Sequence, residues 1–380
     1  MLPHRSIYND DHRAYRDVVR SFLAKEVAPH FEAWENNGIV ARRFWQKAGD
    51  AGLLCPQVPE EFGGGEDFKF NAIVIEETSY AGYGGPAANL TGHSDVATSY
   101  IQHYATEEVR RTWLPKMVAG EAVCAIAMSE PAAGSDLRGL RARAVLEGDE
   151  WVVSGSKTFL SNGQHCDIVV MVVQTGETAD AHEMSLLLVE ADRPGFVRGP
   201  KLHKIGHASS DTSELFLDQV RVPLGNLIGA RGEAMKMMRT QLPQERLSIA
   251  VASMAGAQKA FDITRDYVRE RKAFGTTIGA MQNTRFKLAD LKADLAVGWA
   301  FLDQCLVEAS AHELSAERAS MAKLWITEMQ GRLVDQCLQF FGGYGFMDEY
   351  EVSRLFLDAR VQRIYGGTSE IMREIISRDL

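Results

Sequence analysis

Helical spacing of apolar residues dominates the start of the chain. In the stretch 14–29, Val18, Phe22, Leu23 and Val27 fall on one helical face, and the pattern stops before Pro29. The same spacing predicts further helices at 44–54, at 70–80 and in two pieces of 97–119 that are interrupted before Pro115. Glycine-rich turns separate them, at 56–67 and at 82–86. The first part of the chain is therefore predicted to be helical.

The period changes near residue 123. Short β-like runs with turn signals between them follow at 124–130, 140–162, 167–175, 184–191 and 213–223. Several strands at such short spacing predict a small barrel or sandwich. Helical spacing returns from Gly232 and holds almost to the end, with breaks at 272–279 and 342–345. This order predicts an α+β chain with an N-terminal helical domain (1–122), a small β-domain (123–228) and a C-terminal bundle of four-helix type (229–380).

The longest predicted helix follows Pro243. Proline disfavours helical geometry at the residue before it and is tolerated in a first turn, so Pro243 predicts a helix start or a kink. Glu245 and Arg246 lie at this break in an otherwise apolar element. The carboxylate of Glu245 is either a first-turn charge favoured by the helix dipole or a base held in a pocket, and the helix pattern alone favours the first reading.

Composition narrows the classes of function. The chain has 380 residues, enough for two or three domains, and its 46% hydrophobic and 24% charged residues are typical of a soluble globular protein. A net charge of -10 argues against a nucleic-acid surface. Five scattered cysteines without a Cys-x-x-Cys pair predict reduced thiols, and neither a membrane-length apolar run nor a targeting leader is visible. We therefore expect a cytoplasmic protein with no metal site and no integral membrane segment.

Two glycine-punctuated stretches follow predicted strands. AMSEPAAGSD (127–136) ends a strand in small residues, through which a ligand could approach the backbone, although a plain hairpin connection is as good a reading. KTFLSNG (157–163) places Phe159 and Ser161 two apart, hence on one face of a strand. This pair could flank a flat ring, but a core position is the commoner fate of a phenylalanine.

Two further stretches border the C-terminal helices. RKAFG (271–275), followed by Gln282, comes just after the long helix, where basic residues suit the helix dipole and where the fork of Arg271 would also suit a phosphate. QFFGGYG (339–345) is either a glycine stop between helices or a backbone that could reach a pyrophosphate or ribose.

Together with RIYGGTSEI (363–371), these stretches resemble the signatures of the acyl-CoA dehydrogenase family of flavoproteins, in order and over nearly the whole chain. The helix–β–helix order also resembles that family's layout. The resemblance implies FAD-dependent α,β-dehydrogenation of an acyl-CoA thioester to the trans-2-enoyl-CoA, as in the β-oxidation of fatty acids. It further implies an electron-transferring flavoprotein as electron acceptor, and a homotetramer or dimer of dimers with FAD bridging subunits.

The same resemblance implies the residues of the site. Contacts with the flavin ring or the thioester are expected from Ile126, Met128, Ser129, Gly134, Ser135, Phe159 and Ser161. Contacts with the FAD diphosphate and adenosine, partly from a neighbouring subunit, are expected from Arg271, Phe274, Gln282, Gln339, Gly342 and Gly343, and the last FAD contacts from Thr368 and Glu370. The expected substrate contacts are Ser135, Leu242, Arg246, Tyr365 and Gly367.

One position departs from the family pattern. Many members carry the catalytic glutamate directly after the tyrosine of this last motif, where the chain has Gly366, whose side chain accepts no proton. Either dehydrogenation is lost, as in monooxygenase-type relatives on this fold, or the base comes from elsewhere. The long-chain and isovaleryl branches carry it before an arginine on the long helix, a position matched by Glu245. The resemblance therefore favours Glu245 as base, with the amide of Gly366 still able to stabilise the thioester oxygen.

Two other functions stay open at this point. A flavin monooxygenase or oxidase on the same fold would need no Glu245, and an inert helical binding protein would hold no FAD. For the substrate, the small residues of 80–88 lie where a deep pocket floor is expected, which favours medium-to-long or branched acyl chains; an ordinary interhelical loop has nearly equal weight.

Overall fold

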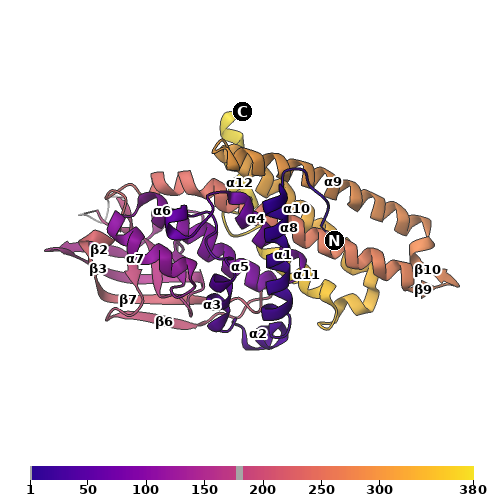
Figure 1. Ribbon diagram of the computed structural model, residues 1–380, viewed down its shortest axis with the longest axis horizontal. Helices are drawn as coiled ribbons and strands as arrows, with labels where there is room; N and C mark the ends of the chain where they lie inside the picture. Colours follow the sequence, from indigo (N-terminus) through magenta and orange to yellow (C-terminus); the bar gives the residue numbers. More distant parts are fainter. Residues whose placement is uncertain (1, 177–182) are drawn as a thin grey trace.

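Three groups of elements follow one another in the computed structural model, which describes residues 2–176 and 183–380 (Figure 1). The first group is helical and comprises α1 (Asp10–Phe22), α2 (Phe31–Asn37), α3 (Arg43–Asp50), α4 (Phe68–Tyr80), α5 (Gly84–Thr91), α6 (Thr98–Tyr104) and α7 (Glu107–Val118). The strands of the second group are β1 (Cys124–Ala127), β2 (Arg143–Glu147), β3 (Glu150–Ser161), β4 (Ile168–Gln174), β5 (Met184–Glu190), β6 (Phe196–Lys201), β7 (Thr212–Pro223) and β8 (Leu227–Ile228). The third group comprises α8 (Ala234–Glu270), the β9–β10 hairpin (Lys272–Ala273 and Thr276–Thr277), α9 (Gln282–Ser310), α10 (Ala316–Phe341), α11 (Glu351–Val361) and α12 (Ser369–Ile376). The α+β prediction and the helix–β–helix order are confirmed.

The structure corrects two details of the first helices. Pro115 lies inside α7 and does not interrupt the helix; the break comes earlier, where the hydroxyl of Thr106 accepts a hydrogen bond from the amide of Val109 and caps α7. The predicted break at 82–86 is shorter than expected. Helix α5 already starts at Gly84, and its first turn contains Gly85 and Pro86.

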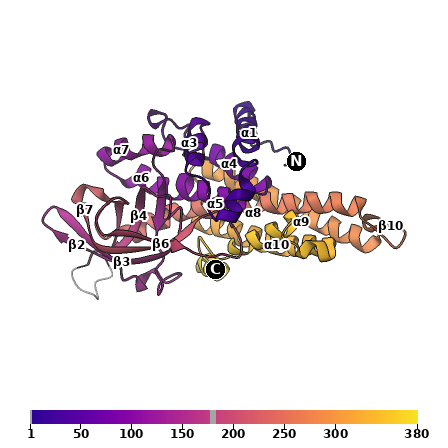
Figure 2. The ribbon, with the colours of Figure 1, turned by 90° about the horizontal axis from the view of Figure 1, so that it is seen from below.

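The middle strands form two half-sheets that pack face to face. One contains β6, β7, β3 and β2, the other contains β1, β4, β5 and β8, and they join through the single pair Arg143 and Gln174. Alternate residues of β4 and β5 enter the core between the half-sheets, and the others enter the core shared with the N-terminal helices. The strands therefore lie directly beside these helices (Figure 2). Strand β6 was missed because Gly199 and Pro200, which are weak strand formers, lie within its six residues, and only Phe196 and Gly199 are buried.

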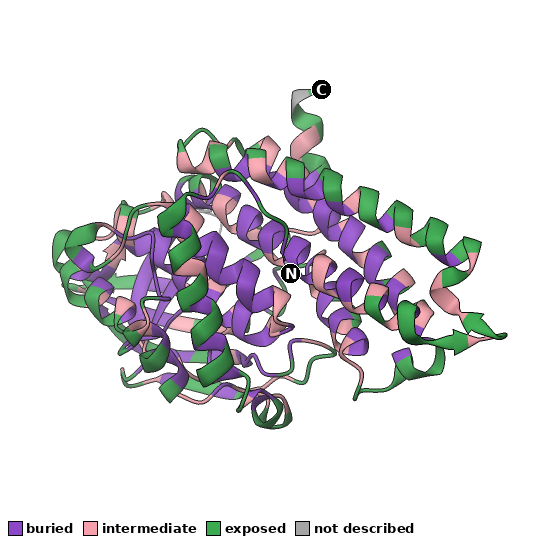
Figure 3. Ribbon diagram, turned by 45° about the vertical axis from the view of Figure 1, so that its right-hand side comes forward, coloured by how far each residue is buried: buried purple, intermediate pink, exposed green. Residues whose placement is uncertain are grey.

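Helix α8 runs from the β-domain to the β9–β10 hairpin and connects the two ends of the molecule (Figure 1). It starts at Ala234, so the prediction that it opens at Pro243 is wrong; Pro243 lies in its interior. Its buried stripe packs against α4, α9 and α10 through residues such as Leu247, Val251 and Met254. Figure 3 shows the contrast with α9, whose outer face is exposed along most of its length. None of the helices in residues 2–176 and 183–380 has the length and apolar run needed to cross a membrane.

Candidate active site

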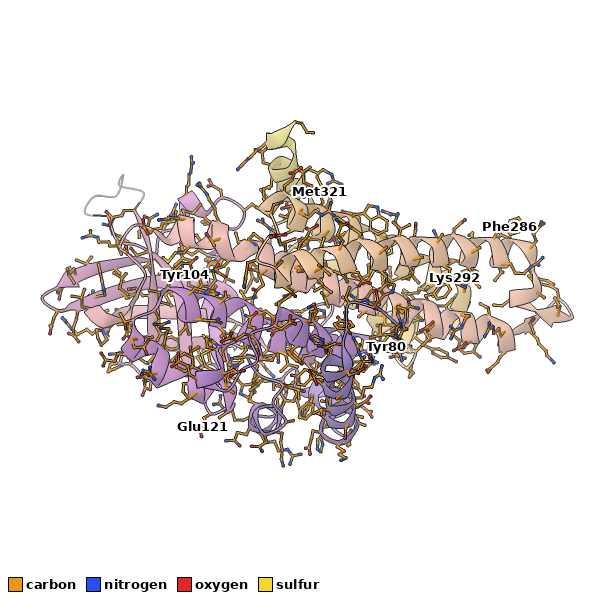
Figure 4. The ribbon with its side chains drawn as sticks, turned by 45° about the horizontal axis from the view of Figure 1, so that its top comes forward. Tyr80, Tyr104, Glu121, Phe286, Lys292 and Met321 are labelled. Carbon is orange, nitrogen blue, oxygen red and sulfur yellow. The ribbon has the colours of Figure 1, made fainter. Side chains whose placement is uncertain are left out.

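Glu245 lies inside α8 at the junction of the helical and β regions. Two hydrogen bonds bracket its position along the helix: Gln241 Nε2 donates to the hydroxyl of Tyr104 at 3.1 Å, and the hydroxyl of Tyr80 donates to Asp262 at 2.8 Å. Figure 4 labels Tyr104 and Tyr80, with Tyr104 on the side of the β-domain. Because Glu245 is far from the helix start, its interpretation as a first-turn charge is wrong. Burial raises the pKa of its carboxyl, against the opposing charges of Arg246 and Lys323.

The carboxylate of Glu245 occupies the space beside Gly366. A Cβ added to Gly366 would lie 3.3 Å from Oε1 of Glu245 and would overlap with Cδ1 of Ile249. Gly366 also has a φ of 62°, in the left-handed region that favours glycine. A larger side chain at position 366 therefore has no room while Glu245 and Ile249 are present, and the two residues singled out in the sequence lie together.

The backbone around Gly366 offers a row of free amides. Arg246 Nε donates to the carbonyl of Gly366 at 3.4 Å, and Lys323 Nζ donates to the carbonyl of Gly367. Within the described residues, the amides of Gly366, Gly367 and Thr368 have no acceptor. Successive free amides with glycines of positive φ form a concavity that suits a partial negative charge. Such donors beside a carboxylate can stabilise the oxygen of a thioester while its α proton is removed.

The residues expected at the flavin ring gather on β1, β3 and the loop after β1. Ile126 and Met128 are half-buried and pack toward the helical core, while Ala125 and Ala127 face the β-domain core. The amide of Thr158 donates to the carbonyl of Ser129 at 3.0 Å, which ties this loop to β3. Gly134 and Ser135 are exposed, and a Cβ at Gly134 would meet open space, so the loop is accessible to a ligand.

Phe159 points outward rather than into the core. A register shift between Lys157 and Leu160 and a φ of 60° at Phe159 turn its ring to solvent, where it is 70% exposed, and Leu160 takes the core position instead. The reading of Phe159 as a core residue is therefore wrong, and Ser161 is partly exposed. An exposed ring held by a strained backbone fits a position that stacks against a flat ligand.

An ion pair between Lys157 and Glu130, both buried, anchors this loop. Lys157 Nζ lies 2.8 Å from Glu130 Oε1, with Lys157 0% exposed, and the same carboxylate accepts the amides of Arg141 at 2.6 Å and Ala142 at 3.0 Å. We expect Lys157→Met to lower the free energy of unfolding by about 3–5 kcal/mol, because it leaves a buried carboxylate without its cation.

Urea unfolding of the unaltered protein and of Lys157→Met measures the change in the free energy of unfolding. The matched control is Lys236→Met, which breaks an exposed pair with Glu233 and should change stability by less than about 1 kcal/mol. Equal losses in both variants would contradict an anchoring role for the buried pair.

A second cluster lies at the far end of α8. A depression of about 420 Å³ is lined by Arg271, Gln339, Gly342 and Gly343 together with the rings of Tyr267 and Tyr344. The guanidinium of Arg271 lies 5.5 Å from the centre of the Tyr344 ring, and a Cβ at either glycine would meet open space. A cation, an amide and unobstructed backbone form a donor set that suits a diphosphate.

Four predicted residues lie outside this depression. Phe274, 97% exposed, occupies the turn of the β9–β10 hairpin, and Gln282 is exposed at the start of α9. Thr368 caps α12, where its hydroxyl accepts the amide of Ile371, and Glu370 is exposed on that helix. The predicted FAD residues therefore lie far apart within one copy of the chain. The flavin-ring group lies at the β-domain, and the depression lies at the opposite end of the helices (Figure 1).

The glycines of 80–88 do not leave an open pocket floor. A Cβ on Gly82, Gly84 or Gly85 would overlap with Glu351, Asp358 or Ser209, respectively. These small residues allow close packing of α4 and α5 against α11 and the loop 207–210. These three glycines therefore give no support to an open pocket floor, and the medium-to-long or branched acyl chain stays a prediction.

Sequence reasoning missed Ile249 beside Gly366, Lys323 on the Gly367 carbonyl, and Ser320, which accepts a hydrogen bond from Arg246 at 3.4 Å. Lys323 lies on the buried stripe of α10 with Ala319, Ala322 and Ile326. A lysine at an apolar position of a helical stripe was the available signal.

Comparisons with known proteins match the whole length of the chain. Family models for the N-terminal, middle and C-terminal domains of acyl-CoA dehydrogenase match residues 9–121, 125–220 and 232–380, respectively. The chain is similar to the mitochondrial long-chain specific acyl-CoA dehydrogenase of Sus scrofa, with 44% identity over 99% of this chain and 88% of the relative. It is also similar to the mitochondrial isovaleryl-CoA dehydrogenase of Oryza sativa, with 30% identity over 98% and 92%.

Solved structures give the same result. An acyl-CoA dehydrogenase from Geobacillus kaustophilus superposes with a TM-score of 0.96 and 41% identity over 99% of both chains. An acyl-CoA dehydrogenase from Bacillus anthracis complexed with FAD superposes with a TM-score of 0.92 and 28% identity, over 100% of this chain and 69% of the other.

Proposed function

The chain belongs to the acyl-CoA dehydrogenase family, and we propose that Glu245 is the base that begins its reaction. The protein is an FAD-dependent acyl-CoA dehydrogenase, an oxidoreductase of fatty acid metabolism. The observation that carries the role of Glu245 is its position beside Gly366, 3.3 Å from where a Cβ of residue 366 would lie. A carboxylate on α8 thereby replaces the one that glycine lacks, which disfavours a monooxygenase or oxidase that has lost the base.

The residues of the chain supply the proton chemistry. Glu245 takes the α proton of the acyl thioester, and burial makes its carboxylate a stronger base than an exposed one. The free amide of Gly366 donates to the thioester oxygen as negative charge develops there. Bound FAD would supply the hydride acceptor for the β carbon, and loss of one proton to Glu245 together with one hydride would leave the α,β double bond.

The donor sets of the two clusters fit the two ends of FAD. We assign the flavin ring to Ile126, Met128, Ser129, Gly134, Ser135, Phe159 and Ser161, and the diphosphate and adenosine to Arg271, Phe274, Gln282, Gln339, Gly342 and Gly343, with Thr368 and Glu370 as further contacts. Because these groups lie at opposite ends of one copy, a second copy would complete each site, which supports a homotetramer or dimer of dimers. Light scattering of the FAD-loaded protein should give a mass of at least two chains, and a monomer that retains FAD would contradict this arrangement.

The substrate is a CoA thioester, with Leu242, Arg246, Tyr365, Gly367 and Ser135 as its proposed contacts. Arg246 donates to the carbonyl of Gly366, the glycine beside the Glu245 carboxylate, and Gly367 follows it in the chain. The pKa of the Tyr365 hydroxyl is raised by burial and by the charges of Asp358 and Glu245. We assign medium-to-long or branched acyl chains from the named relatives, which act on long-chain and isovaleryl thioesters. An electron-transferring flavoprotein is the proposed electron acceptor.

Three further assignments are proposals of the same kind. The domain limits 1–122, 123–228 and 229–380 follow the changes of element type. A cytoplasmic location is supported by the five cysteines, all free and buried in the described chain, which suit a reducing compartment. A role in β-oxidation follows from the substrate class. Cell fractionation tests the location, and flux measurements test the role in β-oxidation.

An anaerobic titration of the purified protein with acyl-CoAs of graded length and branching tests the proposed function. We expect a yellow protein whose flavin absorbance is bleached by its preferred acyl-CoA and not by reduced nicotinamide. Fast reaction of the reduced protein with oxygen, together with bleaching by nicotinamide, would support the monooxygenase alternative instead. Protein without flavin would contradict the assignment.

A further inference from the structure

Lys323 is a buried cation close to the proposed base. It lies on α10, 1% exposed, and its ammonium donates to the carbonyl of Gly367. Burial lowers the pKa of this ammonium to about 8, against the opposing charge of Glu245. Burying a charged ammonium costs free energy unless a partner compensates it. Packing in the core does not offset this cost, which points to another role for Lys323.

The hydrogen bond of Lys323 fixes the orientation of the amide that follows Gly367. In a planar trans peptide the carbonyl and the next N–H point in opposite directions. Lys323 holds the Gly367 carbonyl and Arg246 holds the Gly366 carbonyl, so the amides of Thr368 and Gly367 point away from these cations. Neither amide has an acceptor among the described residues.

We propose that Lys323 is a positioning residue for the dehydrogenation reaction: it holds the backbone of residues 366–368, in which the Gly366 amide is the proposed donor to the thioester oxygen, and its charge acts on the Glu245 carboxylate. The inference rests on the proposed role of Glu245. Its hydrogen bond is to the Gly367 carbonyl, so the proposed action of Lys323 goes through the backbone.

The same loop has a second attachment to α10, which makes the proposal testable. Glu328 accepts the hydroxyl of Ser369 at 2.7 Å and the guanidinium of Arg363 at 3.3 Å. It therefore holds the loop from residue 363 to residue 369 at other points. Loss of Lys323 should release one carbonyl without detaching the segment, and Glu328→Gln loosens the segment without releasing that carbonyl.

The charges around Glu245 determine the sign of the pH effect. Arg246 from the same helix and Lys323 from α10 both favour its ionised form, and Glu328 and Glu370 are the acidic groups that face Lys323. Removing the ammonium leaves Glu245 with one cation, which raises its pKa further. Because the base must be deprotonated, the acidic limb of the kcat/KM profile should move to higher pH.

The experiment compares Lys323→Met with Glu328→Gln in the FAD-loaded enzyme. After chemical reduction of the flavin no hydride can be accepted, so exchange of the α proton of a saturated acyl-CoA into D₂O, followed by NMR, reports the proton step alone. We expect Lys323→Met to slow this exchange and kcat by about 10²-fold, with FAD content unchanged and acyl-CoA binding weakened by less than about 3-fold. Glu328→Gln should change the exchange by less than about 3-fold and leave the acidic limb in place.

Three outcomes would overturn the proposal. The first is a normal rate of α-proton exchange in Lys323→Met. The second is an acidic limb of the kcat/KM profile that does not move in that variant, and the third is an equal loss of exchange rate in Glu328→Gln. If Lys323→Met does not fold, Lys323→Gln replaces it, and normal exchange there also overturns the proposal. Glu245→Gln is measured alongside: normal exchange in that variant removes the proposed base, whereas loss of exchange there with normal exchange in Lys323→Met removes only the role of Lys323.

Discussion

Glu245→Gln should lower the rate of flavin reduction by an acyl-CoA by about 10⁴-fold, the upper range for loss of a general base. The amide of glutamine keeps the size of the side chain and its place beside Gly366 but accepts no proton from the α carbon. FAD content and acyl-CoA affinity should stay within about 3-fold, because the residues assigned to the flavin ring lie on β1, β3 and the loop after β1, whereas Glu245 lies on α8. Anaerobic stopped-flow mixing with the preferred acyl-CoA measures the rate.

Glu233→Gln is the matched control for this variant. It makes the same chemical change just before α8, on a residue whose ion pair within residues 2–176 and 183–380 is with Lys236 at 3.2 Å, and should leave the rate unchanged. In the unaltered enzyme, burial raises the pKa of Glu245, so activity should fall with decreasing pH at values above those of an ordinary carboxyl. A Glu245→Gln variant with a near-normal rate would place the base elsewhere.

Gly366→Ala should lower kcat/KM by about 10²-fold or more, comparable to the loss of an oxyanion-hole donor. The added Cβ would overlap with Cδ1 of Ile249, and a φ of 62° is unfavourable for alanine, so the backbone must shift and carry its amide with it. FAD should remain bound, because the flavin-ring residues lie on the β-domain. Steady-state kinetics measures the loss of kcat/KM, and flavin absorbance measures the FAD content.

Ile249→Val in the same protein should restore part of the lost activity. Valine lacks the Cδ1 atom that the new Cβ meets, and this substitution alone costs about 0.5–1.5 kcal/mol of stability. The backbone preference remains, so recovery should be incomplete. Gly225→Ala serves as the control, since a Cβ there meets nothing within 4 Å. Loss of activity unaffected by Ile249→Val would mean that backbone strain, rather than the overlap, displaces the amide.

The fold was predictable because its signals are local. Apolar spacing changes from a helical to a strand pattern near residue 123 and back near residue 232, and the structure changes element type at the same places. One of the errors has a local cause, and two have a tertiary cause. Strand β6 contains Gly199 and Pro200, which weaken its strand pattern. Pro115 and Pro243 lie inside helices because tertiary packing outweighs one lost hydrogen bond in each.

The candidate site was only partly predictable. The motifs identified Glu245 and Gly366, but no pattern within either segment states that a carboxylate of α8 fills the space beside a glycine near the C-terminus. The outward position of Phe159 depends on a register shift between β3 and β7, which the alternation of the strand does not show. The glycines near residue 84 pack against distant segments, a role that no local pattern reveals.

The sequence by itself determined the order of helices and strands, the family and the residue types available for chemistry, because these depend on periodicity and on short motifs. Only the tertiary structure decided which of these residues meet. It brought Glu245, Arg246 and Lys323 to one stretch of backbone at 366–368, and it placed the flavin-ring group and the Arg271 depression at opposite ends of one copy. The physical reason is that such contacts join positions far apart in the chain, whose distance is set by how the helices and half-sheets pack and not by any local preference.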